Sequence, residues 1–142
     1  MMNNNFSEEA KKKILQAKKE IIERLIEAEV EEILPQRYAK KKGEKETPLI
    51  CPNCGVRKTN QIRRDGHYRR KLRVAEGVIE DLHIPRIECK DCRCYLKLDF
   101  KILDPKKRHL EKDIDEEILR LYLSGAPFQK IKAMLEEKLQ KE

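Results

Sequence analysis

The chain has 142 residues, of which 42% are charged, with a mean hydropathy of −0.81 and a formal net charge of +7. This composition excludes a transmembrane protein, and the lack of a secretory signal pattern predicts a reducing, cytoplasmic location. The positive charge is concentrated, because residues 35–73 carry 13 basic and 3 acidic side chains. Such a block is typical of nucleic-acid binding, with a solvated basic surface as the alternative. Membrane binding is disfavoured because no amphipathic Trp/Phe face accompanies the charge.

The first predicted element is an amphipathic helix over residues 7–34. Ser7 predicts its N-cap, two acids follow in the first turn, and Pro35 ends it. A long apolar stripe on such a helix needs a partner. We predict a homodimer through this helix or packing against a missing domain, with packing on the rest of the chain as the alternative. The stripe comprises Ile14, Ile21, Ile22, Leu25, Ile26, Ile33 and Leu34.

Residues 35–48 have no apolar period and are bounded by prolines, which predicts a basic linker. We expect residues 49–104 to form a zinc-ribbon-like domain and residues 105–142 a helix-turn-helix. The predicted fold class is therefore α+β, with a long N-terminal helix, a small antiparallel sheet and a C-terminal helix pair.

Two C-x-x-C pairs predict a structural metal site in the central domain. Their four sulfurs have the number and spacing of a closed tetrahedral zinc site, with iron as a less favoured metal and a disulfide as the alternative in an oxidising compartment. The predicted ligands are Cys51, Cys54, Cys89 and Cys92. Cys94 is left over, and we predict a bystander thiol there, with substitution for a neighbouring ligand as the alternative.

The segment between the two cysteine pairs predicts short antiparallel strands. Asp65-Gly66 indicates a hairpin turn between residues 61–64 and 67–74. In the second strand, Tyr68, Leu72 and Val74 are predicted to share the buried face. A turn at residues 75–77 leads to a third strand, 78–84, with Val78, Leu82 and Ile84 on one side. Pro85 is typical of an edge strand or of a strand end, and residues 86–88 and 95–100 are expected to be extended.

Arg69, Lys71 and Arg73 are predicted to share the opposite, outer face of the second strand, while Arg70 breaks the alternation. Arginines of these strands are predicted to contact phosphates of double-stranded DNA. The residues assigned to that contact are Arg63, Arg64, Arg69, Arg70 and Arg73.

The C-terminal quarter changes to helical spacing. Asp113 and Glu116 predict a capping box before a helix over 114–123, which Gly125 ends, and Pro127 starts a second helix over 128–139. This pair fits a helix-turn-helix or an ordinary αα-hairpin. The expected packing residues are Ile118, Tyr122, Ile131 and Leu135. In the DNA-binding alternative, the outward-facing residues of the second helix are Gln129, Lys130 and Lys132.

Three segments resemble the Mutator-type insertion-sequence transposases, in the region before their catalytic domain. Residues 22–34 are similar to that family's N-terminal helix, and residues 119–125 with Ile131 and Leu135 to its helix-turn-helix. Residues 64–70 and 77–86 are similar to its R-N-G-Y-R … G-x-I/V-x-x-L-x-V/I-P-R block, with Asp65 for the usual Asn. Pro127 replaces a frequent Ser, and the cysteine pairs are more similar to the zinc ribbons of other insertion-sequence transposases.

The resemblance implies recognition of insertion-element ends during transposition. It also implies that cutting and joining need three carboxylates holding two metal ions in an RNase-H-like domain. No βαβ run follows the helix pair, so we expect no catalysis from this chain. Two other hypotheses remain: a zinc-ribbon adaptor for RNA or a protein machine, and a redox or electron-transfer protein that uses the cysteines.

Overall fold

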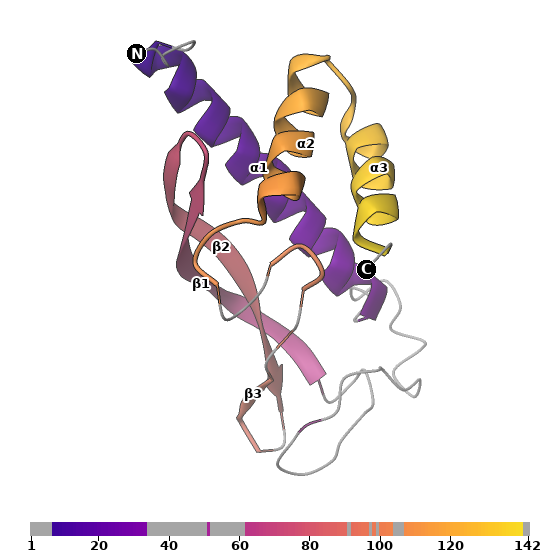
Figure 1. The fold of residues 1–142 in the computed structure, drawn as a ribbon. Coiled ribbons are helices and arrows are strands. Elements are labelled where there is room, and N and C mark those ends of the chain that lie inside the picture. Colours follow the sequence, from indigo (N-terminus) through magenta and orange to yellow (C-terminus); the bar gives the residue numbers. More distant parts are fainter. Residues whose placement is uncertain are drawn as a thin grey trace.

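A computed structural model describes residues 7–33, 51, 62–90, 92–96, 98, 100–103 and 107–140. Three helices accompany a three-stranded antiparallel sheet of order β1-β2-β3, which confirms the predicted α+β class (Figure 1). The predicted linker, residues 35–48, lies outside the described residues. The elements are α1 (Glu8–Ile33), β1 (Ile62–Val74), β2 (Gly77–Cys89), β3 (Tyr95–Leu96), α2 (Lys112–Leu123) and α3 (Phe128–Gln140).

Helix α1 begins as predicted and buries its apolar stripe within the chain. The Ala10 amide donates to Ser7 Oγ over 3.1 Å, which confirms the N-cap. Ile22 and Ile26 are fully buried, and α1 packs on β2 and α2 (Figure 1). Within the described residues, the apolar stripe of α1 is therefore buried by packing on the rest of the chain. The homodimer was predicted because this apolar stripe needed a partner. Since the stripe is buried within the chain, that reason no longer holds, and the homodimer stays an untested prediction.

The hairpin predicted at Asp65-Gly66 is wrong, because β1 runs through both residues as one strand. The pairing shifts there from Arg64 opposite Ile87 to His67 opposite Pro85, so β1 carries one extra residue. Gly66 has φ +71°, the left-handed conformation that glycine adopts without strain. Asp-Gly has therefore formed a β-bulge instead of a chain reversal.

The β1–β2 hairpin turns at Ala75 and Glu76, as predicted, and β2 then continues through Pro85 to Cys89. Pro85 is thus inside the strand, not at its end. A second irregularity between Arg70 and Leu72 changes the facing residues of β2. Ile79, not Val78, consequently takes the buried position.

Tyr68 is 44% exposed, although it was predicted to lie on the buried face. It pairs with Ile84, which is 1% exposed. Helix α1 packs on β2 and the Ile84 side chain is buried, while Tyr68, on the edge strand β1, stays open to solvent.

The two C-terminal helices form as predicted, with different ends. Helix α2 starts after Glu111, which makes no side-chain cap, so the capping box at Asp113 is wrong. At its other end the Gly125 amide donates to the Tyr122 carbonyl and the Ala126 amide to the Leu121 carbonyl. These two bonds, with Gly125 at φ +80°, are a Schellman ending.

The contact between α2 and α3 differs at one predicted residue. Ile118, Ile131 and Leu135 are buried, as expected, whereas Tyr122 is 38% exposed. Leu121 is buried instead, because the helix presents the neighbouring position to the core.

The buried apolar residues form two clusters. The larger joins α1, the β1–β2 hairpin, α2, α3 and the segment after β3. The smaller lies at the far end of the sheet and comprises Val30, Cys51, Ile62, Ile87, Cys89 and Leu96. In the part of the chain described here, no helix has the length and apolar character needed to cross a membrane.

Candidate metal centre and basic face

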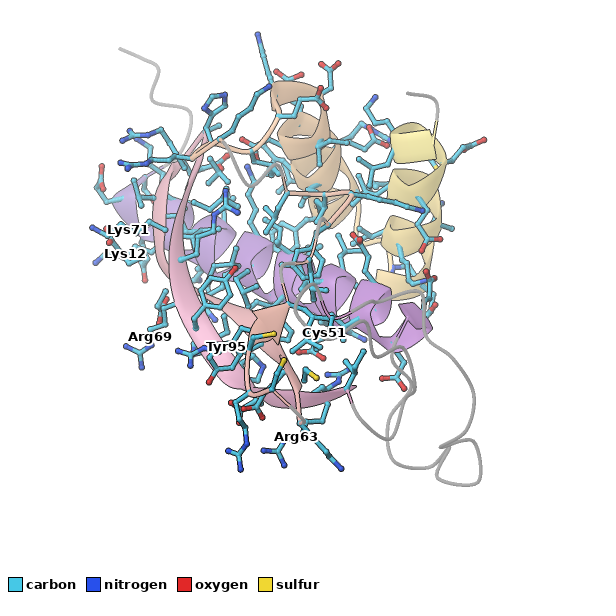
Figure 2. The ribbon with its side chains drawn as sticks, turned by 90° about the horizontal axis from the view of Figure 1, so that it is seen from below. Lys12, Cys51, Arg63, Arg69, Lys71 and Tyr95 are labelled. Atoms are coloured by element: carbon cyan, nitrogen blue, oxygen red, sulfur yellow. The ribbon has the colours of Figure 1, made fainter. Side chains whose placement is uncertain are left out.

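Three predicted ligands, Cys51, Cys89 and Cys92, bring one sulfur each to the same place, with all three sulfurs within 4.8 Å of one another. Cys51 and Cys89 are buried at 1% and 0% exposure, and Cys92 is half-buried. Figure 2 shows sulfur atoms gathered beside the labelled Cys51. Closely grouped, buried thiols are soft donors suited to zinc. The fourth predicted ligand, Cys54, lies outside the described residues.

Cys94 lies in the same cluster and is not remote from it. Its sulfur is 3.3 Å from that of Cys51 and 3.2 Å from that of Cys92. The Cys51 and Cys92 sulfurs are 3.2 Å apart, far beyond the ~2.05 Å of a disulfide bond. Hydrogen bonds to Cys92 and then Cys51 raise the pKa of the Cys94 thiol to about 12. Neighbouring thiols resist joint ionisation without a cation, and a bound metal reverses that preference.

The backbone after β2 brings these cysteines together. The Arg93 amide donates to the Cys89 carbonyl over 2.8 Å, and the Cys89 amide donates to the Cys94 carbonyl over 2.9 Å. Arg93 has φ +63°, a left-handed conformation that is uncommon for a residue with a side chain. The result is a tight knuckle that follows directly from the last residue of β2.

A row of basic side chains lies on one face of β1. The predicted phosphate contacts Arg69 and Arg73 are exposed there, together with Lys71, which alternates with them as the sequence predicted although it was not among the assigned phosphate contacts. Arg63 is exposed as well, but it precedes the bulge, and the pairing register places it on the other side of the strand from Arg69. Figure 2 shows Arg63, Arg69 and Lys71 pointing outward from the sheet. We call Arg69, Lys71 and Arg73 the basic face. Arg63 also pairs with Glu88 over 2.9 Å, although 48% of its side chain stays exposed.

Two predicted phosphate contacts have partners within the chain instead. Arg64 donates to Glu27 over 2.6 Å and to Glu31 over 3.1 Å, which joins β1 to α1. Arg70 donates to the backbone carbonyl of Lys107. These contacts could not be found from the sequence, because they depend on the bulge and on the position of α1.

Aromatic side chains lie near the basic face. The Arg86 guanidinium lies 5.3 Å from the centre of the Tyr95 ring, which is half exposed. Tyr95 also donates to Asp65 over 2.9 Å, which links β3 to the bulge in β1. Exposed tyrosines beside arginines can stack on unpaired bases, and the sequence indicated neither this pair nor its location.

The three α3 residues that were predicted to face outward differ in solvent exposure. Gln129 and Lys130 are exposed in its first turn. Lys132 is half-buried and pairs with Glu136 over 2.9 Å, a contact that raises the pKa of Lys132. The start of α3 is held by Phe128, whose ring lies 3.9 Å from the Arg24 guanidinium of α1.

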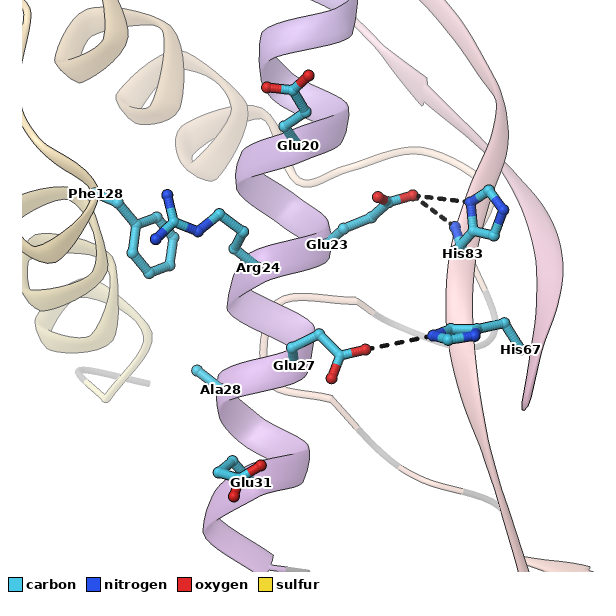
Figure 3. A pocket seen from close by; sticks show the side chains of 9 residues that line it. All are labelled: Glu20, Glu23, Arg24, Glu27, Ala28, Glu31, His67, His83 and Phe128. Carbon is cyan, nitrogen blue, oxygen red and sulfur yellow. Dashed lines mark hydrogen bonds and ion pairs between the residues drawn. The ribbon is translucent and has the colours of Figure 1, made fainter. Parts of the chain in front are cut away.

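An open pocket lies between α1 and the hairpin (Figure 3). Glu23 accepts from the His83 amide over 2.8 Å and lies 3.2 Å from His83 Nδ1, while Glu27 Oε2 lies 3.5 Å from His67 Nε2. In the sequence these histidines are scattered and form no motif. In the structure they face the acidic side of α1 and help hold it against the sheet.

Comparison with protein-family models gave a match to the family described as "Transposase, Mutator family", over residues 2–141. Searches of curated proteins and of solved structures returned no match.

Proposed function

The chain belongs to the Mutator family of transposases, and we propose that it serves there as a zinc-stabilised module that binds double-stranded DNA at the ends of an insertion element. In this proposal the chain recognises the DNA ends, and another part of the transposase cuts and joins the DNA. The observation that carries the proposal is the basic face of β1, in a chain of this family.

Electrostatics support the phosphate contact. Arg69, Lys71 and Arg73 alternate along β1, so their side chains point to the same side of the strand, about 7 Å apart at successive alternate positions. That spacing is comparable to the distance between phosphates of one strand. Basic side chains along a phosphate backbone gain free energy by releasing condensed counterions. Phosphate contacts of this kind position a protein without reading sequence.

The metal has a structural role in this proposal. Cys51, Cys89 and Cys92 would hold a zinc ion with a fourth thiolate, for which the C-x-x-C spacing predicts Cys54. The ion would tie the end of β2, the knuckle and Cys51 together. Ile62, the first residue of β1, belongs to the same small cluster, so the metal would also stabilise the strand that carries the basic face.

Sequence readout is assigned to the C-terminal helices. Gln129 and Lys130 are exposed at the start of α3, and a helix N-terminus is the part of a recognition helix that meets base edges and phosphates. Gln can bond adenine through both polar atoms of its amide, whereas Lys favours guanine or phosphate.

Fluorescence anisotropy of the zinc-loaded full chain tests the proposal. We expect tighter binding to duplex DNA from an element end than to a scrambled duplex, with affinity falling steeply as salt rises. The double variant Arg69→Ala/Arg73→Ala should reduce the slope of log affinity against log salt by about 2. Lys13→Ala, an exposed change on α1, is the control.

Two outcomes would reject this function. One is binding to duplex DNA at low salt that is no stronger than that of an uncharged control protein. The other is a preference for single-stranded or structured RNA, which would favour the adaptor hypothesis.

A further inference from the structure

The sulfur of Cys94 completes a triangle that the spacing of the cysteines does not predict. The three distances among Cys51, Cys92 and Cys94 are 3.2, 3.3 and 3.2 Å. Cys89 joins from the end of β2, within 4.8 Å of the Cys51 and Cys92 sulfurs. Cys51 and Cys92 therefore have Cys89 on one side and Cys94 on the other among the described residues, without any contribution from Cys54.

The triangle has the size of one face of a metal–thiolate tetrahedron. With zinc–sulfur bonds of about 2.3 Å, the sulfurs of such a site lie about 3.8 Å apart. The observed triangle is slightly smaller, so the side chains need to separate by only about half an ångström to accommodate an ion. The Cys94 sulfur thus lies about as close to the Cys51 sulfur as the Cys92 sulfur does.

The knuckle brings Cys94 to this position. In an extended chain, residues two apart have Cα atoms about 7 Å apart and side chains that run parallel. The left-handed conformation of Arg93 shortens this span, and the Cys92 and Cys94 sulfurs come into contact. Two backbone hydrogen bonds between this segment and Cys89 hold the turn.

We propose that Cys94 is a thiolate ligand of the metal centre, able to occupy the fourth position in place of Cys54. The inference rests on the metal centre of the proposed function and adds a redundancy to it. Five cysteines serve four positions, so loss of Cys54 leaves a complete set of thiolates in Cys51, Cys89, Cys92 and Cys94. Cys54 and Cys94 serve the same position, so loss of either one leaves four ligands and loss of both leaves three, whereas Cys51, Cys89 and Cys92 have no substitute.

Metal titration of the full chain tests this proposal, with Zn²⁺ for affinity and Co²⁺ for the ligand set. The variants are Cys54→Ser, Cys94→Ser, the double variant Cys54→Ser/Cys94→Ser, and Cys89→Ser as a control that removes a ligand without a substitute. We expect Cys54→Ser to bind one Zn²⁺ with nearly wild-type affinity. The double variant should lose affinity by about tenfold or more. The thiolate-to-cobalt charge-transfer bands of Cys54→Ser should keep wild-type intensity, and those of the double variant should weaken.

The proposal is overturned if Cys54→Ser alone matches the double variant in both affinity and cobalt spectrum, since Cys94 then contributes no bond. Circular dichroism of each variant separates ligand loss from unfolding, because the larger apolar cluster contains none of these cysteines. Failure of the wild-type chain and of every variant to bind either ion would instead reject the metal centre itself.

Discussion

The Lys18 ammonium on α1 donates to the carboxylate of Asp115 on α2, inside the core, where the lysine is 1% exposed. The same ammonium lies 2.5 Å from Glu76 Oε1 in the β1–β2 turn. Asp115 also accepts from the Ala75 amide over 2.7 Å. One buried lysine therefore connects the long helix, the tip of the hairpin and the first helix of the C-terminal pair.

Replacing Lys18 should be the most destabilising single change at this junction. Lys18→Met leaves two buried carboxylates without their cation, and breaking a buried ion pair in this way costs about 3–5 kcal/mol. Urea denaturation followed by circular dichroism measures the loss. Lys13→Met, an exposed lysine of the same helix, is the matched control and should change stability by less than about 0.5 kcal/mol. A loss for Lys18→Met no larger than the control's would show that the buried pairs do not stabilise the fold.

The bulge in β1 predicts that the stability of the protein depends on the backbone conformation of Gly66. A Cβ added there would meet no atom within 4 Å, so φ +71° alone decides the effect. Gly66→Ala should cost about 1–2 kcal/mol, because the left-handed region is unfavourable for residues with a Cβ. Gly66→Asn should cost less, since Asn adopts that region more readily. Equal stability of wild type and Gly66→Ala in chemical denaturation would contradict the bulge.

Two arginines of β1, Arg64 and Arg69, should contribute differently to stability and to DNA binding. Arg64→Ala removes the pairs with Glu27 and Glu31, and we expect a loss of stability of up to about 1 kcal/mol for such partly exposed pairs. Arg69→Ala should leave stability nearly unchanged and lower the salt slope of DNA binding by about 1. Thermal melts and anisotropy titrations of both variants measure the two effects. The distinction fails if Arg64→Ala lowers the salt slope as much as Arg69→Ala does.

Metal removal should act on one end of the molecule. Chelation removes the link among the cysteines, which belong to or pack against the smaller apolar cluster, while the larger cluster holds α1, α2 and α3 together independently. We expect amide hydrogen exchange to accelerate in β3, the knuckle and the Cys89 end of β2, with helical protection retained. Uniform acceleration throughout the helices would instead mean that the metal is needed for the whole fold.

Local sequence patterns were sufficient to predict the elements whose formation depends on residues close together in the chain. The Ser7 cap, the apolar stripe of α1, the turn at Ala75 and Glu76, and the ending of α2 at Gly125 all follow from short-range preferences. The shared position of Cys51, Cys89 and Cys92 was also predictable, since paired C-x-x-C motifs have few other uses in a reducing environment.

Tertiary structure decided the features that depend on contacts between distant segments. Asp65-Gly66 allows either a reversal or a bulge, and the long pairing of β1 with β2 selects the bulge. Arg64 faces Glu27 instead of solvent only because α1 packs beside the sheet. Nothing in the sequence distinguishes Lys18 from the other lysines of its helix, and it is buried because Glu76 and Asp115 meet it from two other elements. The physical reason is that the sequence determines which charged groups a chain carries, whereas their partners come from distant segments. Only the packed fold brings those segments together.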